Sequence, residues 1–136
     1  MTDEGGPWAV GPGSMPLLVS DMDRALHFYT EVLGLHLLLD ARKKHWVELG
    51  AAQDVGRIAL TLERDGRMVK PCSTGVVLVV DDMRRILERA SQKGVVFTLL
   101  PQRRPWGGLV AKLMDPDHNE ITLLDRNLIG RWSMSA

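Results

Sequence analysis

The sequence predicts an α+β fold made of two copies of one βαβββ module. The stretch LLVSDMDRAL at residues 17–26 recurs sixty-one residues later as LVVDDMRRIL at residues 78–87. Each copy has the pattern of a strand, an acidic helix cap and an amphipathic helix, and three further strand-like runs follow it. One module cannot bury both its helix stripe and a sheet face alone. We therefore expect the two copies to combine their sheets around a shared concavity.

The first module is predicted over residues 14–70. An apolar run from Ser14 to Ser20 has strand length, Asp21 stands at a helix N-cap position, and Gly34 is suited to a left-handed cap at the helix end. Apolar residues between these caps recur at helical spacing: Met22, Ala25, Leu26, Tyr29, Val32 and Leu33. Three more strands are predicted over residues 35–40, 45–49 and 57–63.

The second module is predicted over residues 71–125. A strand over residues 76–80 leads to an Asp81/Asp82 cap, and Gly94 closes the helix. His118 replaces the usual glycine of a tight turn, where histidine tolerates positive φ. The remaining strands are predicted over residues 95–99, 109–114 and 120–124.

The two ends of the chain are predicted to lie outside the modules. Residues 1–13 are expected to form a flexible N-terminal tail. Residues 126–136 are expected to form a C-terminal tail. That tail carries Leu128, Ile129 and Trp132, which favours a dimer contact or a flap over the pocket.

Composition bounds the possible functions. The chain has 136 residues, the size of one domain, and its seventeen basic side chains balance seventeen acidic ones, so nucleic-acid binding is not expected. No apolar run suits a signal peptide or a membrane span. The single cysteine, Cys72, excludes an internal disulfide and favours a cytoplasmic location. Catalytic Ser/His/Asp, phosphate-loop and dinucleotide-binding patterns are missing from the sequence.

Three stretches resemble the vicinal oxygen chelate superfamily, which includes glyoxalase I, extradiol dioxygenases, fosfomycin-resistance enzymes and bleomycin-resistance proteins. They are VSDMDRALHFYTEVLGL, VVDDMRRILERASQKGVVF and PWGGLVAKLMDPDHNEITLLD, within about residues 14–125. The resemblance implies two modules whose mixed sheets form a half-open barrel around a central cavity. It also implies a homodimer, which in some members exchanges modules between chains.

Enzymes of this superfamily hold one divalent metal with His and Glu from the first and late strands of the modules. The positions that match are Ser14, Ala59, Gly75 and Thr122. None of these offers the imidazole, thiolate or carboxylate that the metal needs, so we expect no metal, no cofactor and a roomier, less polar pocket. Other possible ligands lack a spacing that forces convergence: His45, His118, Glu48, Glu63 and Glu120.

Two tryptophans are the leading ligand-binding candidates. Trp106 stands where bleomycin-resistance-like members often carry PWG, and its ring beside Arg103 and Arg104 could stack on a flat ligand or could simply cover the core. Trp46 could be a second stacking wall or a half-buried surface residue. The candidate ligand-binding set is Trp46, Trp106, Arg104, Ala59, Thr61, Ser14, Gly75 and Thr122.

The sequence thus favours a metal-independent binding protein for a small apolar or aromatic molecule, of the antibiotic-resistance or sequestration type. The alternative is a metal-dependent glyoxalase-, lyase- or dioxygenase-type enzyme with displaced ligands. A third possibility is metal-free catalysis by Glu63 or Glu48 as a general base, although Glu63 at a strand end is better suited to a solvated carboxylate. The last is a purely structural or regulatory role.

Overall fold

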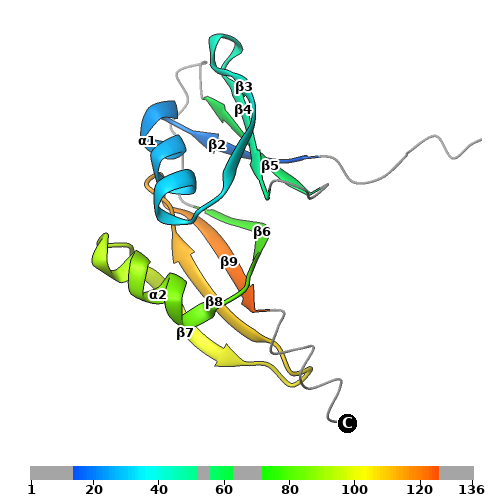
Figure 1. Cartoon of the computed structure of the whole chain (residues 1–136), viewed down its shortest axis with the longest axis vertical. Coiled ribbons are helices and arrows are strands. Elements are labelled where there is room, and N and C mark those ends of the chain that lie inside the picture. The colour runs from blue at the N-terminus through cyan, green and yellow to red at the C-terminus, as the bar shows by residue number, and fades with distance from the viewer. Residues whose placement is uncertain (1–13, 52–55, 63–71, 126–136) are drawn as a thin grey trace, which may run out of the picture.

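The computed structural model describes residues 14–51, 56–62 and 72–125. The first module contains β2 (Ser14–Val19), α1 (Met22–His27), the π-helix η1 (Phe28–Val32), β3 (His36–Ala41), the 3-10 helix η2 (Arg42–Lys44), β4 (Trp46–Gly50) and β5 (Arg57–Leu62). The second contains β6 (Cys72–Val80), α2 (Met83–Gln92), β7 (Phe97–Arg103), β8 (Leu109–Met114) and β9 (Asn119–Asp125). Within these ranges, the βαβββ order is confirmed in both modules (Figure 1).

Each module forms its own four-stranded mixed sheet. The strand orders are β2-β5-β4-β3 and β6-β9-β8-β7. In both sheets the first strand lies parallel to the last, and the other neighbours are antiparallel. The repeat seen in the sequence is therefore a repeat of topology as well, and the predicted α+β fold is confirmed.

The acidic caps begin both helices as predicted. The Asp21 carboxylate accepts a hydrogen bond of 3.0 Å from the Arg24 backbone N–H, and Asp82 accepts one of 3.2 Å from the Arg85 N–H. Each carboxylate satisfies an N–H that has no partner inside the helix. Gly34 and Gly94 follow the helical segments with φ values of +83° and +75°, in the left-handed region that favours glycine.

The first helix differs from the prediction because it widens into a π-turn. The Leu33 N–H donates to the Phe28 carbonyl five residues earlier, at 3.1 Å. The wider turn changes the angular spacing, so neighbouring Phe28 and Tyr29 are both buried, with ring centroids 5.0 Å apart in an edge-to-face contact. A regular helical stripe predicts Tyr29 in the core and misses Phe28.

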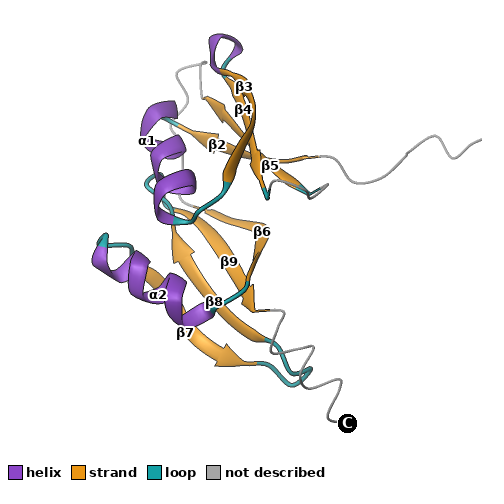
Figure 2. Cartoon of the chain, viewed as in Figure 1, coloured by secondary structure: helices purple, strands orange, loops and turns teal. Residues whose placement is uncertain are grey.

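The core lies between each helix and one face of its sheet. In the first module, buried side chains on alternate strand positions face α1 and η1: Leu17, Val19, Val47, Leu49, Ile58 and Leu60. The two helices lie on the same side of the molecule (Figure 2). Arg89 of α2 joins them, since its Nε donates to the Glu31 carbonyl at 2.9 Å. The opposite sheet faces are left without helices.

A polar junction connects the two modules. The β8–β9 turn of the second module contacts the β2–α1 segment of the first. The Tyr29 hydroxyl donates to the buried Asp115 carboxylate at 2.7 Å, and the Asn119 side-chain amide donates to the Leu18 carbonyl at 3.1 Å. Arg24 pairs with Asp117 at 3.1 Å. Burial, followed by the nearby Asp115 charge, raises the pKa of Tyr29, so its hydroxyl stays a donor.

Asp115→Asn should weaken this junction. One Asp115 oxygen accepts from the Asp117 and Asn119 backbone N–H groups, and the other from Tyr29 and the Asn119 side chain. In the variant an NH2 group would replace one of these oxygens and would face an N–H or O–H group that also donates. We therefore expect a loss of about 2 kcal/mol in the free energy of unfolding. Urea denaturation measures this change.

The matched control is Asp40→Asn, which makes the same chemical change at an exposed carboxylate paired with Arg42. We expect only a small effect there, because solvent screens an exposed pair. Equal losses for the two variants would contradict a special role of the Asp115 junction.

Candidate functional site

The sheet faces that point away from the helices are the candidate binding surface, and we call them the open faces. On the first sheet, strand register places three rows side by side: Trp46 with Thr61 and Leu18, Glu48 with Ala59 and Pro16, and Gly50 with Arg57 and Ser14. The sequence predicts that Trp46 and Glu48 share a face but leaves open which one. The structure places both on the open face.

A hydrogen-bonded cluster occupies the middle of this face. The indole Nε1 of Trp46 donates to one Glu48 oxygen at 2.8 Å, and Arg57 Nη1 donates to the other at 2.8 Å. The Glu48 side chain is only 16% exposed, whereas that of Arg57 is 40% exposed. The carboxylate therefore orients an aromatic plane on one side and a guanidinium on the other.

These contacts decide what Glu48 can do chemically. The hydrogen bond from Trp46, followed by that from Arg57, holds the pKa of the Glu48 carboxyl below its usual range. A general base at neutral pH needs the opposite shift. These contacts therefore disfavour Glu48 as a general base. Glu63 lies outside the described residues.

The four positions aligned with family metal ligands do not form a chelating site. Ser14 and Ala59 lie on the open face of the first sheet, and Ala59 is buried beside Glu48. Thr122 lies on the open face of the second sheet, next to Val77, and Gly75 takes a positive φ within β6. Across the residues that the structure describes, no three His, Cys, Asp or Glu side chains are grouped for a metal ion. Within the described part of the chain, the side chains at these four positions do not fit a divalent metal.

The second open face combines apolar and polar side chains. Strand register places Val77 and Val79 of β6 beside Thr122 and Leu124 of β9. Val77 and Val79 are 44% and 46% exposed, and Leu39 of the first open face is 45% exposed. Apolar side chains from both sheets are thus left half uncovered in the single chain.

Trp106 lies in the β7–β8 turn, away from the Glu48 cluster. The turn is closed by the Arg104 N–H, which donates to the Gly108 carbonyl at 2.7 Å. The indole ring is 57% exposed and rests on Gly108, where an added Cβ would meet ring carbons at 2.0 Å. The described part of the chain therefore leaves much of Trp106 uncovered. Sequence reasoning missed that the Trp106 ring packs against Gly108. The two glycines that follow Pro105 and Trp106 in the sequence are the signal that could have indicated it.

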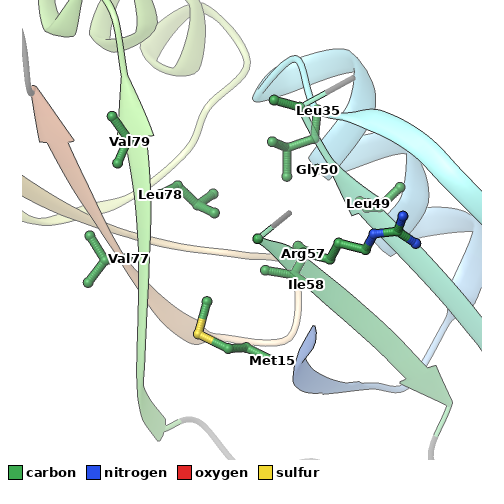
Figure 3. Close-up of a pocket in the computed structure, with 11 residues that line it drawn as sticks. Met15, Leu35, Leu49, Gly50, Arg57, Ile58, Val77, Leu78 and Val79 are labelled. Atoms are coloured by element: carbon green, nitrogen blue, oxygen red, sulfur yellow. The ribbon is translucent and has the colours of Figure 1, made fainter. Parts of the chain in front are cut away.

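A cavity of about 310 Å³ separates β6 from the first sheet. Figure 3 shows Leu78 and Met15 pointing into it, while Val77 and Val79 lie on the other side of β6. Arg57 is the charged residue of its lining; the others are Met15, Leu35, Leu49, Gly50, Ala51, Gly56, Ile58, Val77, Leu78 and Val79. No residue of the predicted ligand-binding set lines it. Arg57, which sequence reasoning missed, is where the cavity and the open face meet.

Comparison with known proteins identifies the family. The sequence profile described as Glyoxalase/Bleomycin resistance protein/Dioxygenase superfamily matches residues 11–123. The chain belongs to this superfamily. No curated protein matches the chain.

Solved structures agree with the assignment. A superfamily member from Sphaerobacter thermophilus is 29% identical with a TM-score of 0.74, covering 86% of this chain and 98% of its own. TnmS3, an antibiotic binding protein from Streptomyces sp. CB03234, is 25% identical with a TM-score of 0.67 and the same coverage. The fosfomycin resistance protein FosX from Mesorhizobium loti, at 17% identity and a TM-score of 0.65, covers 91% of this chain and 98% of its own and shares the fold.

None of the helices in the described ranges is both long enough and apolar enough to cross a bilayer.

Glu48→Gln should flatten the acid dependence of stability. The pKa of Glu48 is lower in the folded protein than its ordinary value of about 4.5. The charged carboxylate therefore contributes fully to the free energy of unfolding above that pH, and this contribution is lost as the pH falls through the lower folded pKa. Urea unfolding between pH 6 and pH 3 measures this loss. The free energy of unfolding should fall more steeply with decreasing pH in the unmodified protein than in Glu48→Gln.

The control for this experiment is Glu88→Gln, which removes an exposed carboxylate of α2 and leaves the Glu48 cluster intact. The free energy of unfolding of Glu88→Gln should fall more steeply with decreasing pH than that of Glu48→Gln. Coinciding curves for Glu48→Gln and the unmodified protein would show that the Trp46 and Arg57 contacts do not hold the carboxylate in its charged form.

Proposed function

We propose that this superfamily member binds a small planar, largely apolar or aromatic molecule and acts by sequestration or carriage. The observation that carries the proposal is the Glu48 cluster, which fixes the Trp46 ring on an open sheet face. A side chain held in this way offers a stacking surface at little cost in conformational entropy. The aligned metal positions Ser14, Ala59 and Thr122 are small, uncharged residues on the open faces, and Gly75 lies in β6.

The same proposal includes a homodimer in which an open face of one chain covers an open face of the other. It is supported by the half-exposed apolar residues Leu39, Val77 and Val79, which one chain leaves uncovered. A ligand held between two faces would lose most of its contact with water. Trp106 and Arg104 of the β7–β8 turn are proposed as a second aromatic and polar contact. A reducing, cytoplasmic setting fits the single cysteine.

The neighbours support the binding role over catalysis. TnmS3 is an antibiotic binding protein, and it is more similar in sequence to this chain than FosX is. The alternative of a metal-dependent lyase or dioxygenase needs ligands that the described residues do not group together. Elemental analysis of protein purified without chelators discriminates between the two. A stoichiometric transition metal would favour the enzyme.

Planar antibiotics should bind with a saturable change in tryptophan fluorescence. We expect at least one member of a panel of quinone, phenazine and bithiazole compounds to bind. Trp46→Leu should weaken that binding about tenfold, because it removes the stacking surface. The dissociation constants are measured by calorimetry, because Trp46→Leu removes one of the tryptophans whose fluorescence would report binding.

The control is Val96→Ala, which truncates an exposed apolar side chain in the loop before β7. Its affinity should match that of the unmodified protein. Absence of binding across the panel, or an unchanged affinity in Trp46→Leu, would overturn the proposal.

A further inference from the structure

Arg57 combines features that suit it to a ligand contact. It lies at the start of β5, in the row next to Glu48 and Ala59. One of its N–H groups is used by Glu48, at 2.8 Å, and the side chain remains 40% exposed. A guanidinium carries five N–H donors in a rigid plane. A pair of parallel donors on its outer edge matches the two oxygens of a carboxylate.

The Glu48 carboxylate holds the Arg57 guanidinium in place before any ligand arrives. Arg57 lines the cavity between β6 and the first sheet, where its neighbours include Leu49 and Ile58. In Figure 3 its guanidinium points away from β6. Glu48 fixes the guanidinium, and Trp46 in turn fixes Glu48. An arginine whose guanidinium is already held by a carboxylate loses less freedom on binding, which strengthens each contact that it makes.

Glu48 itself is not available to a ligand. Its two oxygens accept from Trp46 and Arg57, and its pKa is held low, so it stays charged and occupied. A ligand that approaches this part of the open face therefore meets an aromatic plane and guanidinium donors rather than a free carboxylate. The arrangement favours an acceptor oxygen attached to a flat ring.

We propose that Arg57 is the specificity-determining anchor of the pocket and selects planar aromatic carboxylates over their neutral analogues. The inference rests on the proposed function, because it assigns a ligand class to the same open face. The aromatic ring lies against Trp46, and the carboxylate takes two N–H donors from Arg57. Glu48 acts as a positioning residue for both.

A matched pair of probes tests the anchor: naphthalene-2-carboxylate and naphthalene-2-carboxamide, which share shape but not charge. Calorimetry of the full chain should show the carboxylate binding about tenfold more tightly, as expected for a charge-assisted pair of hydrogen bonds. Arg57→Gln should reduce this ratio to about one and leave carboxamide binding within about twofold. Arg57→Lys, which keeps the charge but loses the planar donors, should give an intermediate ratio.

The control variant is Arg42→Gln, which removes another arginine held by a carboxylate, that of Asp40. Its carboxylate preference should equal that of the unmodified protein, and circular dichroism checks the fold of each variant. Equal binding of the two probes, or a ratio that survives Arg57→Gln, overturns the anchor. If a planar antibiotic binds but neither probe does, only the anchor fails. If nothing binds, the proposed function fails with it.

Discussion

The hydrogen bond between Tyr29 and Asp115 is the constraint on which the arrangement of the molecule depends. Each module builds its own sheet and helix, and no strand pairs across the two within the described ranges. The modules are held together by a hydrophobic core cluster that includes residues of both and by polar contacts such as this one, which is buried and joins residues 86 positions apart. Because Asp115 also accepts from its own turn, the β8–β9 turn and the first helix are fixed together.

This junction places both helices on one side and so determines what the sheets can do. The sheet faces that point toward the helices are buried in the core, and the opposite faces remain accessible to ligands or to another chain. On the first open face, the charged Glu48 lies beside Ala59, one of the four positions aligned with metal ligands of the family. Glu48 orients the Trp46 indole on one side and the Arg57 guanidinium on the other.

The sequence predicted the features that depend on local chemistry. The caps at Asp21 and Asp82, the glycines that end the helices and the positive φ of His118 all follow from what single residues prefer. The repeated topology followed from the duplicated motif. The strand boundaries moved by a few residues; β7, for example, extends to Arg103. Such shifts are expected because pairing, not propensity, ends a strand.

The features that were missed depend on contacts between distant residues. Alternation placed Trp46 and Glu48 on one face, but only strand register brings Arg57, nine residues later, to the same carboxylate. Phe28, left out of the predicted apolar stripe, is buried beside Tyr29 at the π-turn. The packing of Trp106 against Gly108 and the hydrogen bond of Tyr29 at the junction likewise depend on the three-dimensional structure, which the sequence pattern does not provide.

The central claim is that the open faces of one chain are completed by a second chain around a ligand. Sedimentation equilibrium tests it most directly, since one chain has a mass of 15.2 kDa. The account predicts a mass of two chains at micromolar concentration, with dissociation promoted by a charge placed on the open face, as in Val77→Glu. A species of one chain mass at all concentrations would contradict it.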